Sequence, residues 1–438
     1  MTHQESIVRP GRNLAEGRWT AGELSVYLAL ILSCTALPVT IPTSFTVGGL
    51  IFQLYEPFLA VAALYVLARR RPSKYVFRRS LLVAASLGVG LTVGILNENS
   101  LQKIYQDVRL PIILAVGILV AGGIASTEVV SRCLRLLPWI LWISAAVIVL
   151  ASTTGLEIGG RTESVMSSEG GDATRLLSPT TFLAVAVLCG FVGIVVARKL
   201  TLRSALKYAL PALVIIGLSF SRNHLLALGV SLVFTIVALR SIDAIIGLLG
   251  LLVTAILFVC VCVLLLSALP SDSWLSEQVT AYSARVLEGS TGSSLSSDAS
   301  VGYRVEETSR IVPVIEQSPI VGQGMGAAYQ PPEGQSGQFL YDRGPYYAHN
   351  FYLWLLLKAG VVGLTLFLLA VLGPIWRALR APNKGQLVAG AGTAAFLAVN
   401  FVAPLPLGTP ESLILGALIG LLAGYSRDRA LGEERLNN

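Results

Sequence analysis

The sequence predicts an all-α protein that crosses a membrane many times. Of its 438 residues, 54% are hydrophobic and only 13% are charged, proportions that are not typical of a soluble chain of this length. The hydrophobic residues gather in runs close to the roughly 20 residues that an α-helix needs to cross a hydrocarbon core about 30 Å thick. The net charge of +7 is divided among short basic clusters between these runs. This distribution indicates membrane topology and argues against a nucleic-acid-binding patch.

We expect about twelve transmembrane helices in a single integral-membrane domain, residues 1–438. The first apolar run follows a polar segment with Arg9, Arg12 and Arg18. No small-residue cleavage pattern follows it, so we interpret this run as a retained span. The expected spans are 24–44, 48–68, 80–96, 108–126, 136–153, 178–197, 206–220, 224–239, 243–269, 350–376, 386–404 and 411–425.

The Lys and Arg residues predict the orientation of the spans, because cytoplasmic loops retain them. If the N-terminus is cytoplasmic, most of these residues fall in cytoplasmic segments, for example 69–79 and 377–384. Both termini are therefore expected in the cytoplasm. The two largest polar loops, 154–178 and 270–348, are then expected on the outer face.

The loop 270–348 is the longest segment without an apolar run, and a loop of this length is usually functional. Its first half is rich in Ser and Gly, which favours flexibility. From Gly302 onward, apolar residues recur at helical spacing. We expect one or two short amphipathic helices on the outer membrane face, interrupted by Pro313 and ended by Pro319 and Gly322.

The hairpin 219–224 joins two apolar runs that are short for a full span, so its tip is expected below the outer surface. A guanidinium at that depth, here Arg222, needs an anionic or polar partner. One interpretation is that Arg222 extends to phospholipid headgroups or pairs with a structural carboxylate. The other is that it meets the phosphates of a lipid-linked substrate. His224 stands beside it at the tip, and we expect it, together with Asn350, among the substrate-binding residues.

Arginines are unusually frequent in the outer loops, which the positive-inside rule should deplete. A single such residue is most simply a solvated or interfacial charge. Together they suggest a cationic site, and the bidentate guanidinium suits pyrophosphate better than an ammonium group does. The six residues are Arg161, Arg175, Arg222, Arg285, Arg304 and Arg310.

His349 and Asn350 stand where the long loop becomes an apolar helix, beside Tyr346, Tyr347 and Tyr352. A histidine at a membrane boundary can be a plain interfacial residue, but a neutral imidazole can also accept a proton from a sugar hydroxyl. The outer carboxylates that could assist it remain unranked: Glu306, Glu307, Glu316 and Asp342. No His/Cys cluster or paired-carboxylate spacing predicts a metal, and we expect no cofactor.

Gly322, Gly324 and Gly326 form a G-x-G-x-G pattern, but no βαβ unit surrounds it, so we exclude a dinucleotide site. We expect these glycines to permit a tight turn with positive φ. Glu56 and Lys358 are the conspicuous ionisable residues inside apolar runs, and we interpret both as structural.

These motifs, in this order, resemble the O-antigen ligase and O-antigen polymerase superfamily of bacterial envelope enzymes. The resemblance covers roughly residues 205–365, and the hairpin departs from the family pattern because small residues commonly follow its arginine, where this chain has Asn223 and His224. The matching segments are Ser219–Arg222, Gly302–Arg304, Pro319–Gly326, and His349–Leu353 followed by Gly360 and Gly363.

The resemblance implies a membrane glycosyltransferase fold of the GT-C type. It implies a glycan ligase of the bacterial plasma membrane that takes glycan from an undecaprenyl-pyrophosphate donor and passes it to a glycan or glycolipid acceptor. By the same resemblance, His349 activates or orients the acceptor while Arg222 and Arg304 hold the pyrophosphate. Two alternatives remain open: a polymerase of the same superfamily, and a transporter or flippase of lipid-linked glycans.

Overall fold

The computed structural model describes residues 19–47, 50–166, 172–196, 201–250, 253, 257, 270, 273–287, 299–335, 338–380 and 382–436. Most of the described chain is helical, as predicted. Within the described ranges, four helices are long and apolar enough to cross a membrane, and five more are apolar but shorter. The total of about twelve spans therefore remains a prediction. Most of the expected span 243–269 lies outside the described residues.

The helices follow the predicted runs over much of the chain. In the first half they are α1 (Ala21–Cys34), α2 (Glu56–Tyr65) with the π-helical turn η1 (Val66–Arg70), α3 (Lys74–Leu96), α4 (Leu101–Ile124), α5 (Glu128–Thr154) and α6 (Thr180–Val196). The next are α7 (Leu202–Ser204), η2 (Ala205–Ala209), α8 (Leu210–Gly217), α9 (Asn223–Leu239), α11 (Trp274–Tyr282), η3 (Ser283–Leu287) and α13 (Ala299–Gln317). The last are α14 (Phe339–Asp342), η5 (Gly344–Tyr346), α15 (Phe351–Arg380), α16 (Lys384–Val399), η6 (Leu405–Leu407) and α17 (Thr409–Leu436).

Two antiparallel β-hairpins interrupt the helices. Strands β1 (Ser44–Val47) and β2 (Leu50–Gln53) pair with each other, as do β3 (Arg161–Met166) and β4 (Asp172–Leu177). The boundaries predicted for the first two spans were therefore wrong. Helix α1 ends at Cys34, because Pro38 and Pro42 break the following run, and the β-branched and aromatic residues beyond it pair as strands.

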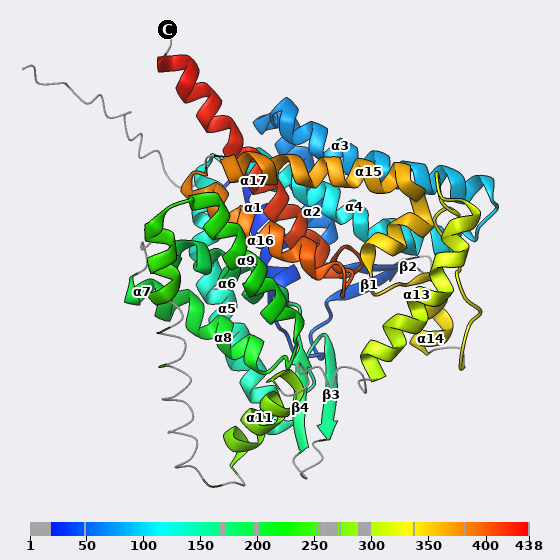
Figure 1. Cartoon of the computed structure of the whole chain (residues 1–438), viewed down its shortest axis with the longest axis horizontal. Coiled ribbons are helices and arrows are strands. Elements are labelled where there is room, and N and C mark those ends of the chain that lie inside the picture. The colour runs from blue at the N-terminus through cyan, green and yellow to red at the C-terminus, as the bar shows by residue number, and fades with distance from the viewer. Residues whose placement is uncertain are drawn as a thin grey trace, which may run out of the picture.

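Helices α4 and α17 pack closely in the middle of the bundle (Figure 1). Glycines at four-residue spacing on α17 allow this approach. A Cβ atom on Gly416 would lie 2.4 Å from the carbonyl oxygen of Leu114, and one on Gly420 would lie 2.5 Å from that of Ile118. Small residues at helix contacts are typical of membrane proteins, because they let backbones approach one another.

Helix α15 breaks at Gly360, where the backbone adopts φ 61° and ψ −166°. The segment after α13 fills the break: the N–H groups of Val361 and Val362 donate to the carbonyls of Pro319 and Ile320, at 2.9 and 3.1 Å. These bonds satisfy backbone groups that the break leaves without helical partners, as an apolar environment requires. The break therefore ties α13 to α15.

We expect the substitution Gly360→Ala to lower the free energy of unfolding by several kcal/mol. Backbone strain alone should account for about 1–3 kcal/mol of this loss. A Cβ atom there would lie 2.3 Å from the backbone of Ile320, and the residue would have to keep its positive φ. Thermal unfolding in detergent measures the loss. Gly88→Ala is a matched control, because nothing lies within 4 Å of a Cβ at that position. Equal unfolding temperatures for both variants would contradict this account of the break.

The glycine pattern forms the predicted turn: Gly322, Gly324 and Gly326 have φ values of 77°, 89° and 81°. The turn lies against α3, where the Met325 N–H donates to the carbonyl of Gly90 at 2.8 Å. It also contacts α4, because the Asp107 carboxylate accepts from the Gly326 N–H at 2.7 Å. The turn thus fixes the end of α13 to the transmembrane bundle.

The intramembrane charges have partners, which agrees with the structural interpretation. Lys358 is fully buried and its Nζ lies 2.6 Å from the Asp107 carboxylate and 2.6 Å from the carbonyl oxygen of Ala327. Glu56 pairs with Arg109 at 2.5 Å, with both side chains mostly buried. Lys358 thereby holds the same glycine turn from the side of α15.

In the second half of the long loop, one helix continues through the position where we expected an interruption. Helix α13 runs through Pro313, so that prediction was wrong, although the helix does end before Pro319. Pro313 removes the N–H that would bond to the carbonyl of Ser309. Both residues are exposed, so water can meet the released carbonyl.

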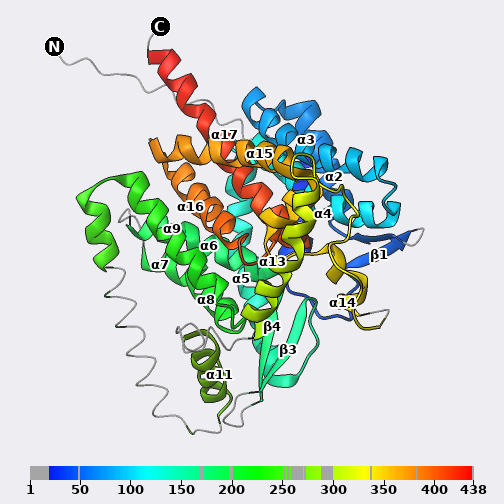
Figure 2. The ribbon, with the colours of Figure 1, turned by 45° about the vertical axis from the view of Figure 1, so that its right-hand side comes forward.

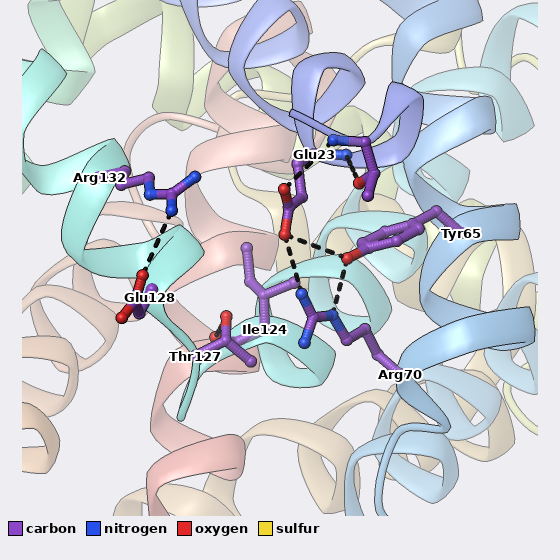
Figure 3. Close-up of polar contacts among 8 residues, drawn as sticks. Glu23, Tyr65, Arg70, Ile124, Thr127, Glu128 and Arg132 are labelled. Carbon is purple, nitrogen blue, oxygen red and sulfur yellow. Dashed lines mark hydrogen bonds and ion pairs between the residues drawn. The ribbon is translucent and has the colours of Figure 1, made fainter. Parts of the chain in front are cut away.

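Arg70 and Arg132 each pair with a carboxylate. Arg70 bonds to Glu23 at 2.9 Å and to Tyr65, and Arg132 bonds to Glu128 (Figure 3).

In Figures 1 and 2, the two β-hairpins, α13 and α14 lie together in the lower and right-hand part of the view, away from the C-terminal end of α17. We call the part formed by β1–β4, α13 and α14 the loop end.

Candidate active site

His349 is held at the loop end by a carboxylate from α13. Its backbone N–H donates to Oε2 of Glu307 at 2.8 Å, and its Nδ1 lies 3.1 Å from Oε1 of the same carboxylate. Glu307 is buried, with 5% of its surface exposed, whereas the His349 side chain is 30% exposed. One buried carboxylate thus fixes both the backbone and the ring of a partly exposed histidine.

This contact determines the histidine tautomer. A carboxylate only accepts hydrogen bonds, so in the neutral imidazole Nδ1 carries the proton and Nε2 keeps its lone pair. Among the described residues, none bonds to Nε2. The rings of Tyr303 and Tyr347 stand edge-on to the imidazole, with centroids 5.6 and 5.2 Å away, and restrict its rotation. The arrangement suits a general base.

Tyr329 supports the carboxylate from the glycine-turn side. Its hydroxyl lies 3.3 Å from Oε1 of Glu307 and donates to the carbonyl of Tyr347 at 2.9 Å. Burial raises the pKa of the Tyr329 phenol, and the charge of Glu307 raises it further. The phenol therefore stays protonated at neutral pH and remains available as a donor.

Charges from separate segments converge near Tyr347. Burial raises the pKa of its phenol, Glu307 and Glu411 raise it further, and Arg161 and Arg304 lower it. Arg161 begins β3, Arg304 precedes Glu307 by one helical turn on α13, and Glu411 lies in the first turn of α17. The fold thus brings two of the predicted arginines close to the segment that carries His349.

Arg304 is partly buried, and its Nε atom is buried without a hydrogen-bond partner within the described part of the chain. Such a donor is costly when it stays unsatisfied. Oε2 of Glu411 is likewise buried and has no partner among described residues. Both atoms could therefore bond to a polar ligand or to water.

Arg222, Arg175 and Arg285 form a second group, at the hairpin 219–224 between α8 and α9. Arg222 lies immediately before α9, and Arg175 on β4 donates from Nε to the carbonyl of Ser219 at 3.0 Å. His224 is buried below the hairpin, with its Nδ1 at 3.1 Å from Oγ of Ser219. Arg285 belongs to η3, whose Val286 packs in one cluster with Phe220 of the hairpin.

Two predicted site residues have other roles in the structure. Arg310 pairs with the carboxylates of Glu306 and Glu333, at 2.6 and 2.5 Å, and bonds to Gln330. These contacts do not favour a phosphate ligand at Arg310. The Asn350 side chain accepts from the N–H groups of Tyr352 and Leu353, at 2.9 and 3.2 Å, and so caps α15.

The sequence did not single out Glu307, Tyr329 or Glu411. Glu307 stood unranked among four carboxylates, because the helix face towards His349 could not be chosen without knowing where α13 lies. Glu411 follows Pro410 at the start of an apolar run, which is a usual position for a helix N-terminus. Only the packing of α17 brings it near Tyr347.

In the described residues, no group of three His, Cys, Asp or Glu side chains could hold a metal ion. A family model described as O-antigen ligase matches residues 208–368. Over this segment the match supports the resemblance to the O-antigen ligase superfamily. No curated protein matches the chain.

The O-antigen ligase segment contains His349, Glu307, Arg304 and the Arg222 hairpin. Arg161, Arg175 and Glu411 lie outside it: Arg161 and Glu411 act on Tyr347, and Arg175 bonds to Ser219 of the hairpin 219–224. The resemblance stated from the sequence is therefore confirmed, and it implies activity of the ligase or polymerase type.

Proposed function

We propose that the protein transfers a glycan from an undecaprenyl-pyrophosphate donor to an acceptor hydroxyl on the outer face of the bacterial plasma membrane. In this proposal both termini are cytoplasmic and the loop end faces outward. The observation that carries the proposal is the Glu307–His349 pair, which lies in a segment of the O-antigen ligase superfamily and close to Arg304.

The reaction is a displacement at the anomeric carbon of the donor glycan. The acceptor oxygen forms the new glycosidic bond, its proton passes to Nε2 of His349, and the anomeric C–O bond to pyrophosphate breaks. Glu307 stabilises the resulting imidazolium, because its carboxylate lies 3.1 Å from Nδ1. The departing pyrophosphate keeps the bonding electron pair, and its growing negative charge is what the arginines stabilise.

We assign Arg304 and Arg222 to the pyrophosphate, with Arg161 and Arg175 beside them. An unsatisfied guanidinium nitrogen at Arg304 supports this assignment, because a phosphate oxygen would complete its hydrogen bonds. Arg285 stays a weaker candidate of the same group. Glu411 is a candidate for binding sugar hydroxyls, since a carboxylate oxygen accepts from them.

An apolar cavity of about 480 Å³ supports a lipid-linked substrate. It lies along α4, and its wall includes the Glu56–Arg109 pair. Ile104 in this wall lies close to Gly326 of the glycine turn, so the cavity approaches the loop that carries His349. Its other lining residues are largely apolar and include Phe52, Leu59, Ile112, Ile113 and Val116.

A transporter of lipid-linked glycans is the alternative from another class. Such a protein should carry polar groups along a path through the membrane. Arg161, Arg175, Arg304 and Glu307 instead lie in the loop end, and the buried charges at Lys358 and Glu56 have structural partners. These contacts favour the enzyme.

A one-sided vesicle assay tests the proposed function. The purified protein is placed in vesicles with a fluorescent lipid-pyrophosphate glycan and acceptors of several classes. We expect donor consumption and a glycosylated acceptor, only when donor and acceptor are on the side of the loop end. Movement of the donor across the bilayer without glycan transfer would show a transporter and refute the proposal.

Arg304 and Arg310 form a matched pair, because both lie on α13 and only Arg304 lacks a partner at a buried nitrogen. We expect Arg304→Ala to lower glycan transfer by roughly 10-fold to 100-fold, as the loss of a charge-assisted hydrogen bond implies. Arg310→Ala should change transfer by no more than about threefold, because its pairs are exposed. Initial rates at subsaturating donor measure both. The reverse order would remove Arg304 from the site.

A further inference from the structure

His224 is a buried histidine that the proposed reaction does not use. Only 2% of its surface is exposed, and its ring lies edge-on to Phe182. Its Nδ1 lies 3.1 Å from Oγ of Ser219, a residue with no exposed surface. Its Nε2 is buried and bonds to none of the described residues. A buried imidazole with one polar contact depends on that contact for its orientation.

The hydroxyl of Ser219 determines which histidine tautomer is present. Ser219 donates its only hydroxyl proton to the carbonyl of Ile216 at 2.6 Å. The oxygen must therefore accept from His224, so Nδ1 carries the proton and Nε2 does not. His224 acts as a donor that ties the first turn of α9 to the end of α8.

The bond spans a strained turn. Phe220, between the two residues, has a φ of 43°, in the left-handed region that bulky side chains rarely adopt. Such a conformation persists only where surrounding contacts hold it. Packing of Phe220 against Ala173, Ala281 and Val286 supplies one constraint. The Ser219–His224 bond supplies another within the hairpin itself.

The same serine positions an arginine from a different element. The carbonyl of Ser219 accepts from Nε of Arg175 at 3.0 Å, and the carbonyl of Leu218 accepts from the N–H of Leu176 at 3.0 Å. Strand β4 is thus joined to the hairpin at Ser219. Arg222 follows three residues later on the strained turn. Ser219 therefore joins the strand that carries Arg175 to the turn that carries Arg222, and the spacing of these two residues depends on it.

We propose that His224 is a positioning residue that sets this spacing for the pyrophosphate of the donor. It acts through the hydrogen bond from Nδ1 to Ser219 and does not touch the substrate itself. This inference rests on the proposed function, because it assumes that Arg175 and Arg222 bind the two phosphates. It differs from our expectation from the sequence, in which His224 binds substrate directly.

Two substitutions separate this role from simple filling of space. The amide nitrogen of Asn occupies nearly the place of Nδ1, so His224→Asn can still donate to Ser219. The amide of Gln reaches the place of Nε2, so His224→Gln fills the site without that bond. We expect His224→Gln to raise the KM for donor about tenfold with kcat nearly unchanged, as the loss of one buried hydrogen bond implies. His224→Asn should restore most of the affinity.

A double-mutant comparison tests the path through Ser219. We expect Ser219→Ala to raise the KM for donor as His224→Gln does, and the double variant to be no worse than either alone. The unfolding temperature of every variant is measured in detergent, so that a loss of folding is distinguished from a loss of donor affinity. Equal KM values for His224→Asn and His224→Gln, or additive effects with Ser219→Ala, would overturn the inference.

Direct binding distinguishes this inference from the proposed function. Wild-type protein is titrated with an undecaprenyl-pyrophosphate analogue that carries no transferable glycan. Failure of the wild type to bind it would refute the proposed function. Binding by the wild type with equal affinity in both His224 variants would refute only the role of His224.

Discussion

The substitution Glu307→Gln is expected to lower the rate of glycan transfer by roughly 10² to 10⁴, the range typical of general-base catalysis. The side chain keeps its shape, but its amide nitrogen can donate where the carboxylate accepted. Nδ1 of His349, 3.1 Å away, would then serve as the acceptor and the ring proton would move to Nε2. A protonated Nε2 cannot take the proton of the acceptor hydroxyl. The loss should appear in kcat.

The neighbouring residue provides the control. Glu306 precedes Glu307 on α13, is more than half exposed and pairs with Arg310. Glu306→Gln makes the same chemical change without touching His349, so its kcat should stay within about threefold of the wild type. Initial rates at saturating donor measure both variants. If the two lost activity equally, the loss would come from α13 as a whole and not from the Glu307–His349 pair.

The substitution Lys358→Met is expected to lower the free energy of unfolding by about 3–5 kcal/mol, the usual effect of removing one partner of a buried ion pair. It leaves Asp107 buried without its cation, although the Gly326 N–H still donates to that carboxylate. The carbonyl of Ala327 also loses its donor. The glycine turn should loosen first, because both groups hold it.

An exposed ion pair provides the comparison for Lys358. Arg70 pairs with Glu23 at 2.9 Å, but its side chain is 33% exposed, so Arg70→Met should cost about 1 kcal/mol or less. Chemical or thermal unfolding in detergent gives both values. A cost for Lys358→Met as small as that for Arg70→Met would show that the buried pair does not stabilise the glycine turn.

The sequence predicted much of the helical architecture, because long apolar runs have few alternatives in a membrane. The runs 80–96, 108–126 and 350–376 correspond to α3, α4 and α15 within a few residues at most ends. The two hairpins were missed, since strands of four to six residues give a weak alternating pattern. The error at Pro313 has a different cause: exposure decides whether a helix tolerates a proline, and exposure depends on packing.

The candidate site was predictable only in part. His349 and Arg304 stood out by position and by charge in a loop where both are uncommon. Glu307 could not be distinguished from Glu306, because one residue changes the face of the helix by about 100°. The hydrogen bond from Arg175 to Ser219 joins β4 to the hairpin 219–224. The two residues are 44 positions apart in the sequence, and no local pattern indicates their contact. Such pairings follow from tertiary packing alone.

The break in α15 explains why the loop and the histidine belong together. Gly360 lies eleven residues after His349, and the segment that fills the break begins directly after α13. Two backbone hydrogen bonds at the break and the Lys358–Asp107 pair therefore fix both ends of the site, Glu307 on α13 and His349 before α15. The glycines could be recognised in the sequence, but the hydrogen bonds and the ion pair between these segments could not.

The most direct test of the account is donor binding and glycan transfer by His349→Ala, measured on the same purified preparation. Donor affinity should equal that of the wild type, because the arginines and not His349 hold the pyrophosphate, while transfer to the acceptor should be almost abolished. A variant that binds donor and transfers glycan at the wild-type rate would contradict the central claim that His349 takes the proton of the acceptor.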